Sequence, residues 1–137
     1  MFLVFFILSS CSLINAYECF NYFDNYLLEG YTLTINQTGH MCSCSNFEDS
    51  NLKKKVEHLV IGNSVQSIGN NCFSNFKSLK TVDLGSVVEI GKYSFYNSGL
   101  ISLNIPKSVI KVDSYAFSEN KNLESITMDD SNTKEIS

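Results

Sequence analysis

Apolar positions in the second half of the chain recur with a period near 22 residues. Phe73, Phe95 and Phe117 are each separated by 22 residues, and a leucine (Leu79, Leu100, Leu123) follows each of them. After each leucine comes a pair of apolar residues that alternate with polar ones. The pairs are Leu59 and Ile61, Val82 and Leu84, Leu103 and Ile105, and Ile126 and Met128. Because successive side chains of a strand point to opposite faces, the pattern predicts short strands with these pairs inward.

A second apolar position, at Ile68, Ile90 and Val112, precedes each phenylalanine. We expect a bend there, with Gly69 and Gly91 supplying a permissive backbone. A helical turn then places the phenylalanine in the core beside a small neighbour, which is Cys72, Ser94 or Ala116. One unit buries too little to offset an ordering entropy of about 1–2 kcal/mol per residue, so copies must stack. An amphipathic helix does not fit, because the apolar spacing within the strands is not 3.6.

These residues resemble a known family. Ile105-Pro106-Lys107-Ser108-Val109, Val112, Ala116-Phe117, Asn120 and Leu123 are similar to the leucine-rich repeat of BspA-like surface proteins. Residues 65–73 and 88–95 match the same frame, and residues 31–41 are similar to the strand and turn that often precede the first repeat. Gly62 and Gly85 replace the proline of this repeat, and Asp113 replaces a glycine.

The resemblance implies an α/β, β-rich fold. It would be a leucine-rich-repeat solenoid, a short right-handed superhelix of about 3–4 repeats with an N-terminal hairpin cap. It also implies a role in adhesion or as a surface antigen. The family carries no catalytic motif that the resemblance could transfer to this chain.

Residues 1–16 are predicted to be a signal peptide. The apolar run Phe2–Leu8 is too short to span a bilayer, and Ala16 is a small residue suited to cleavage. The absence of Lys and Arg from the start of the chain departs from the usual pattern. Two alternatives stay open: a buried strand, and a lipoprotein cleavage box at Leu8-Ser9-Ser10-Cys11.

Residues 17–52 are predicted to form the N-terminal cap, and residues 53–137 the repeats, the last of them truncated. Leu33 and Ile35 alternate with Thr32 and Thr34, which predicts an antiparallel hairpin strand. The run Lys53-Lys54-Lys55 is expected on a solvated face. Ile136 occupies the place of Ile68, Ile90 and Val112, and no apolar tail follows it.

Export would expose the cysteines to an oxidising compartment. The disulfide candidates are Cys19, Cys42 and Cys44; Cys42 and Cys44 are too close to bridge each other, so one of them is expected to pair with Cys19. Cys72 falls at a core position, where we expect a small buried hydrophobic residue. His40-x-Cys42-x-Cys44 lacks the second half of a zinc site, so no metal is predicted. Asn36-Gln37-Thr38 is a sequon for N-glycosylation at Asn36.

Composition narrows the functional classes. The 137 residues carry a net charge of −4 and include no arginine, which disfavours binding to nucleic acid. The sequence contains neither a G-x-S-x-G elbow nor a glycine-rich phosphate loop, and it has two histidines. We therefore expect neither an enzyme nor a cofactor.

The candidate binding site is the outward face of the predicted strands. Its residues are His58, Val60, Thr81, Asp83, Ser102, Asn104, Ser125 and Thr127. Such a shallow polar ladder suits a broad protein or glycan ligand at a cell surface. The alternative is a secreted structural coat protein that associates end to end through unpaired strand edges.

Overall fold

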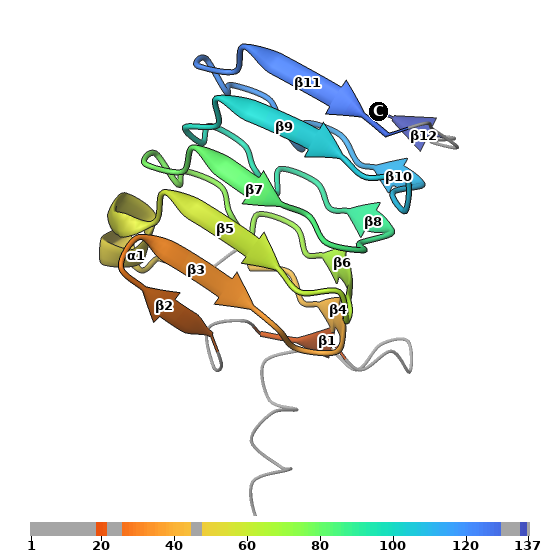
Figure 1. The fold of residues 1–137 in the computed structure, drawn as a ribbon, viewed down its shortest axis with the longest axis horizontal. Coiled ribbons are helices and arrows are strands. Elements are labelled where there is room, and N and C mark those ends of the chain that lie inside the picture. Colours follow the sequence, from red (N-terminus) through yellow and green to blue (C-terminus); the bar gives the residue numbers. More distant parts are fainter. Residues whose placement is uncertain (1–18, 22–25, 45–47, 130–134, 137) are drawn as a thin grey trace, which may run out of the picture.

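The computed structural model describes residues 19–21, 26–44, 48–129 and 135–136 as a stack of coils (Figure 1). In chain order the elements are β1 (Cys19–Phe20), β2 (Leu27–Glu29), β3 (Thr32–Ile35), β4 (Gly39–Met41), α1 (Ser50–Lys55), β5 (His58–Ile61), β6 (Val65–Ile68), β7 (Thr81–Asp83), β8 (Glu89–Ile90), β9 (Ser102–Ile105), β10 (Lys111–Val112), β11 (Ser125–Met128) and β12 (Glu135–Ile136). The predicted signal peptide lies outside the described residues.

The strands form two sides of the stack. The first side contains the sheet β2-β3-β5-β7 and, beyond it, the pair β9-β11; the second side is the sheet β1-β4-β6-β8-β10-β12. Each coil contributes one strand to each side, and successive coils pair in parallel, with Leu59 opposite Val82 and Leu103 opposite Ile126. This arrangement confirms the β-rich solenoid that the repeat period predicts.

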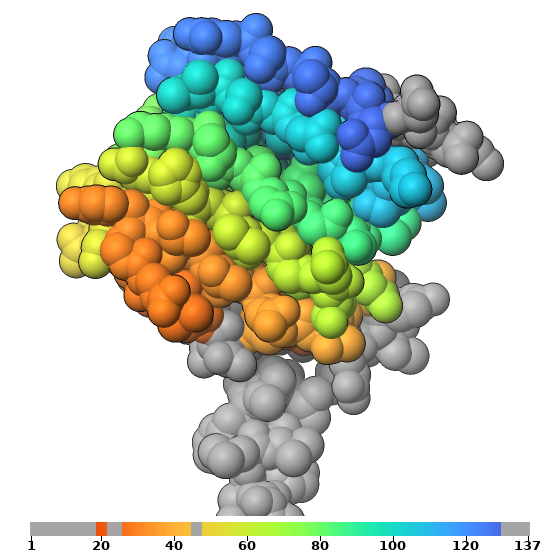
Figure 2. Space-filling model, viewed as in Figure 1, coloured from red at the N-terminus to blue at the C-terminus, as the bar shows by residue number. Residues whose placement is uncertain are grey.

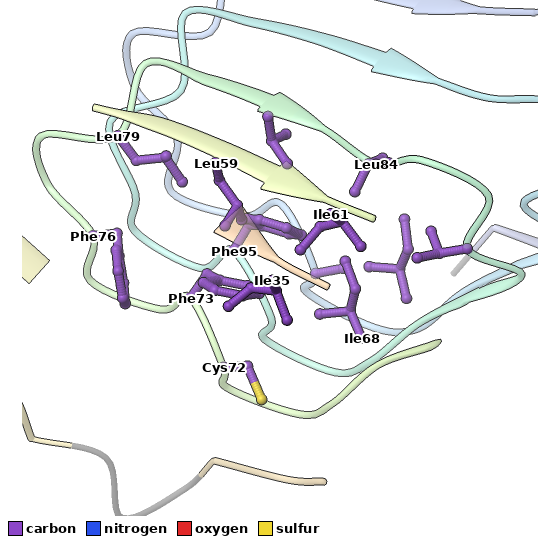
Figure 3. Packing of buried hydrophobic residues seen from close by; sticks show 14 of the residues in the cluster. Ile35, Leu59, Ile61, Ile68, Cys72, Phe73, Phe76, Leu79, Leu84 and Phe95 are labelled. Atoms are coloured by element: carbon purple, nitrogen blue, oxygen red, sulfur yellow. The ribbon is translucent and has the colours of Figure 1, made fainter. Parts of the chain in front are cut away.

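The phenylalanines form a ladder through the interior. The ring centroids of Phe73 and Phe95 lie 5.4 Å apart at 20°, and those of Phe95 and Phe117 lie 5.3 Å apart at 8°. Phe73 and Phe95 are fully buried, whereas Phe117 is half-buried. Figure 3 shows the first two rings beneath Leu59 and Ile61. The predicted stacking of equivalent side chains is therefore confirmed.

Each phenylalanine lies in an irregular turn and not in the predicted helical turn, because one residue on either side of it has a left-handed backbone. These residues are Asn71 and Asn75 (φ 62° and 63°), Tyr93 and Asn97 (56° and 54°), and Tyr115 and Glu119 (59° and 61°). The amide of Phe73 donates to the carbonyl of Ser94 (2.7 Å), and that of Phe95 donates to Ala116 (2.8 Å). These backbone hydrogen bonds therefore join neighbouring coils and do not close a helix.

Gly69 and Gly91 serve close packing, not backbone freedom. Neither has a positive φ. A Cβ at Gly69 would collide with the carbonyl of Cys42, and one at Gly91 would lie 2.7 Å from the carbonyl oxygen of Ile68. Glycine is needed at both positions because the coil below leaves no room for a side chain.

The second side of the stack consists of strands where the sequence predicted bends. Ile68, Ile90 and Val112 are the buried residues of β6, β8 and β10, and they lie in register. At the end of this sheet Val112 is opposite Ile136, as the placement of Ile136 in the repeat predicts.

The N-terminal end carries the predicted hairpin. β2 and β3 pair antiparallel, with Leu28 opposite Leu33, and β3 also pairs in parallel with β5. The chain then forms α1, which the sequence did not predict. The Asp49 side chain accepts hydrogen bonds from the amides of Asn51 and Leu52, both at 3.0 Å, and Leu52 is buried. Lys54 and Lys55 are exposed, as expected for a solvated run.

Two disulfides fasten this end to the stack. Cys19 pairs with Cys42, and Cys44 pairs with Cys72. The expectation that Cys72 is only a small buried hydrophobic residue is therefore wrong. It is buried, as its core position predicts, but it also bonds Cys44, which lies after β4, to the turn that contains Phe73.

The C-terminal end of the described stack is open. Ile126 and Met128 stand where the pattern predicted inward side chains, but they are 55% and 42% exposed. The equivalent residues one coil earlier, Leu103 and Ile105, are buried. The inward face of β11 therefore has no covering layer among the described residues.

Candidate functional site

The eight predicted ligand-binding residues lie on the outward face of β5, β7, β9 and β11; we call these eight residues the strand face. Seven of them are exposed and Val60 is half-buried. Register places His58 beside Thr81 and Val60 beside Asp83; farther along, Ser102 lies beside Ser125 and Asn104 beside Thr127. Figure 2 shows the side chains of successive coils covering this side of the molecule in order. The structure thus arranges the predicted residues as two columns.

One column contains the imidazole of the strand face. His58 Nδ1 and Thr81 Oγ1 are hydrogen-bonded at 2.7 Å across β5 and β7. Beside them the ammonium of Lys80 lies 2.6 Å from the carboxylate of Glu57. Both pairs are at least partly open to solvent. They therefore fix side-chain positions on the surface without creating an enclosed site.

The other column contains Val60, Asp83, Asn104 and Thr127. Thr127 Oγ1 donates to Asn104 Oδ1 over 2.8 Å, across β9 and β11. The carboxylate of Asp83 accepts from the amide of Gly85 at 2.9 Å, which holds the turn after β7. Hydroxyl, amide and carboxylate groups therefore stand at the spacing of parallel strands, which suits hydrogen bonding over a broad, flat contact.

Two threonines extend the columns by one strand. Thr32 lies opposite His58 and Thr34 lies opposite Val60, on β3. The predicted site does not include them, although their alternation with Leu33 and Ile35 carries the same signal. They were missed because the segment was assigned to the cap, whereas β3 lies beside β5 in the first sheet.

A polar hollow of about 210 Å³ lies on the second side of the stack. Ser67, Glu89 and Lys111 line it from three neighbouring strands in register, and the crowded glycines Gly69 and Gly91 form part of its wall. No feature of the sequence was assigned to this hollow. The sequence predicts bends at Ile68, Ile90 and Val112, and bends give no alternating pattern that would mark outward residues.

The His40-x-Cys42-x-Cys44 motif does not supply free thiols for a metal, since both cysteines are in disulfides. His40 Nδ1 is hydrogen-bonded to Ser67 Oγ at 2.9 Å. Among the described residues, no group of three or more His, Cys, Asp or Glu side chains could hold a metal ion. None of the helices in that part of the chain is long and apolar enough to cross a membrane.

Tyrosines gather on the turns that contain Phe95 and Phe117. The Tyr93 and Tyr115 rings are stacked, with centroids 5.1 Å apart at 6°, and Tyr96 meets Tyr93 edge to face at 5.4 Å. A left-handed backbone costs a side chain such as tyrosine about 1–2 kcal/mol, whereas asparagine adopts it more readily. An aromatic pair returns about 0.5–1.5 kcal/mol. The ring stack therefore roughly offsets the backbone cost and gives the fold little net stability.

The repeat pattern and the solenoid together decide the family. Residues 42–137 match the BspA type leucine rich repeat region in 6 copies. The chain belongs to this family. The BspA-type match begins before residue 53, where the sequence predicts the repeats to start.

Two solved structures are similar in fold to this BspA-type chain. A leucine-rich repeat protein from Eubacterium ventriosum aligns with a TM-score of 0.50 and 20% identity over 78% of this chain, which spans 42% of that protein. A leucine-rich repeat protein of T. pallidum aligns with a TM-score of 0.41 and 17% identity, over 74% of this chain and 67% of that one. No curated protein matches the chain significantly in sequence. The Eubacterium likeness supports the solenoid fold alone.

Proposed function

We propose that this chain is a cell-surface or secreted interaction module that binds a protein partner across the strand face. The observation that carries the proposal is the pair of polar columns, held in register on parallel strands and exposed to solvent. Such a face offers many hydrogen-bonding groups over a wide area and no deep pocket, which fits a macromolecule better than a small molecule. A glycan is the other ligand class that the sequence predicts for this face.

Features outside the strand face support export. Both disulfides would be reduced in most cytosols and would persist outside the cell. Residues 1–16 have the apolar run of a signal peptide, and Asn36 of the sequon is exposed at the end of β3. Membership of the BspA-type family favours adhesion, or exposure as a surface antigen, as the biological setting.

The test compares variants that fold alike. Asp83→Asn removes the negative charge but keeps an oxygen acceptor for the Gly85 amide, so the turn after β7 is preserved. The variant combines it with Asn104→Ala, which removes an amide from the strand face. The matched control combines Glu89→Gln with Asn122→Ala, which changes the same two group types elsewhere on the exposed surface. Binding of the labelled proteins to cultured host cells is the measurement.

We expect the strand-face variant to lose at least about tenfold in affinity while the control retains wild-type binding, because a few residues near the centre of an interface carry most of its binding energy. Equal binding by all three proteins would exclude the strand face as the contact surface. Equal losses in both variants would exclude it as well, since the effect would then depend on net charge.

A secreted coat protein is the second candidate function. It is favoured by the exposed Ile126 and Met128 on β11, an edge strand of the first side of the stack. An unpaired, apolar strand edge is a template for another strand. Self-association that depends on concentration and requires no other protein distinguishes this candidate from the first.

A further inference from the structure

The polar hollow on the second side of the stack extends over successive coils. Gly69 and Gly91 form part of its wall, and a side chain at either position would collide with the neighbouring coil, so the space stays open there. At the same place in the next coil stands Asp113, whose side chain lines the hollow. The volume of about 210 Å³ is below the roughly 300–1,000 Å³ of sites for drug-sized ligands, so the hollow suits a smaller molecule.

Three charged side chains line this hollow, and they are Glu89, Lys111 and Asp113. Glu89 and Lys111 are opposite each other on β8 and β10, and Asp113 follows two residues after Lys111. Neighbouring strands are about 4.8 Å apart and each residue advances about 3.3 Å, so the backbone of Lys111 is within about 7 Å of that of both acidic residues. Among the described residues, none of the three charges takes part in a salt bridge.

The polar groups around these charges are held in place by hydrogen bonds. Asp113 Oδ1 accepts from the amide of Ser114 at 2.8 Å, which orients the carboxylate. Ser67 Oγ is bonded to His40 Nδ1 at 2.9 Å. Lys111 and Asp113 are half-buried, so part of their hydration is lost without a protein counter-charge taking its place. The hollow therefore presents one positive and two negative groups that a bound molecule can pair with.

We propose that this hollow binds a small zwitterion of the α-amino acid class. The ligand's carboxylate lies on the ammonium of Lys111, and its ammonium lies between the carboxylates of Glu89 and Asp113. Hydrogen bonds between charged groups are the strong ones. A simple anion would meet two carboxylates and a simple cation would meet the ammonium, so a ligand with both charges fits best. Among the described residues that line the hollow there is no aromatic ring, which disfavours a stacked base or sugar.

The proposal does not depend on the function proposed for the strand face, because the two surfaces lie on different sides of the stack. Binding to host cells and binding of an amino acid are separate measurements. Glu89→Gln is a control in the first of them alone.

The experiment titrates the whole chain, labelled with ¹⁵N, with glycine, alanine and serine and follows the backbone amide signals by NMR. Each amino acid is compared with its N-acetyl derivative, which lacks the ammonium, and with its amide, which lacks the carboxylate. Lys111→Met removes the ammonium and keeps most of the stem, and Asp113→Asn keeps an oxygen acceptor for the Ser114 amide. The matched control combines Lys54→Met with Glu48→Gln, which removes the same two charge types from exposed positions in and just before α1.

We expect at least one amino acid to shift the amide signals of residues that line the hollow. It should bind at least about tenfold more tightly than either derivative, because each derivative loses a set of charge-assisted hydrogen bonds. In Lys111→Met the advantage over the amide should disappear, and in Asp113→Asn the advantage over the N-acetyl derivative should fall. A purely structural role of these two side chains would weaken all three ligands alike. The control should keep both advantages.

Three outcomes would overturn the proposal. The first is the absence of any shift in the wild type with all three amino acids. The second is equal binding of the amino acids and their derivatives. The third is the same loss of discrimination in the control, since the effect would then reflect overall charge and not the hollow.

Discussion

Phe95 lies between two aromatic rings, with Phe73 on one side and Phe117 on the other. It is fully buried, so Phe95→Ala leaves a cavity that neighbouring coils cannot close without shifting the stack. We expect the free energy of unfolding to fall by about 3–5 kcal/mol. Urea denaturation monitored by circular dichroism measures the loss. Phe117→Ala is the matched control and should cost less, because Phe117 is only half-buried.

Gly69 tests the close approach between coils. A methyl group there meets the backbone carbonyl of Cys42, which cannot move without shifting the neighbouring coil. Gly69→Ala should therefore lower the free energy of unfolding by about 1–3 kcal/mol, as overpacking does. Gly62→Ala is the milder control, because the nearest group there is the Asn36 side chain, which can rotate away, and the nearest backbone atom, the Ile35 carbonyl oxygen, is 3.2 Å from the added methyl. The measurement is the midpoint temperature of thermal unfolding of the two variants. Equal midpoints would contradict this role of Gly69.

For individual residues, the sequence predicted which side chains are buried but not always which bonds they form. The phenylalanine ladder was predictable because a period of 22 residues is visible whatever the local geometry. The bond of Cys72 was not, since a cysteine at a core position is equally typical of a packed side chain and of a buried disulfide. The stacking of coils decides between them by bringing Cys44 alongside Cys72.

Among the elements, the strands of the first side were predictable and those of the second were not. β5 and β9 have four residues each, so apolar and polar positions alternate clearly. β8 and β10 have two residues each, with one buried position, and a single inward residue shows no alternation. The left-handed backbone at Tyr93, Tyr115 and Glu119 was hidden for a different reason, because tyrosine and glutamate are rarely found with a positive φ.

The Cys44–Cys72 bond closes a segment with a sequence separation of 28 residues, which contains α1, β5 and β6. Replacing both cysteines by alanine removes this restraint on the unfolded chain and should lower the free energy of unfolding by about 2–4 kcal/mol. Urea denaturation without reductant is the measurement. With reductant in both samples, the wild type and the variant should unfold alike, because Cys19–Cys42 is then lost from both. A variant that matches the unreduced wild type would show that the bond contributes nothing to stability.

For the molecule as a whole, the two ends of the stack differ. The β2–β3 hairpin and two disulfides cover the first coil, and the polar columns run from this end toward β11. The columns could be predicted from the sequence because they alternate with the core. Their extension to Thr32 and Thr34 could not, because it required knowing that β3 joins the same sheet.

The exposed apolar side chains of β11 lead to a prediction about self-association. Among the described residues, Ile126 and Met128 expose apolar surface on β11, and a second copy stacked there would bury it. We expect the sedimentation coefficient to rise with protein concentration. The substitutions Ile126→Ser and Met128→Ser together should lower the association constant at least about tenfold.

Ile110→Ser is the matched control for this association. Ile110 is 45% exposed and precedes β10, one coil before β11, so its loss should leave association unchanged. An equal effect of the control would mean that exposed apolar area anywhere on the surface drives the process. A wild type that stays monomeric at every concentration would remove the coat-protein candidate and leave the strand face as the surface through which this solenoid acts.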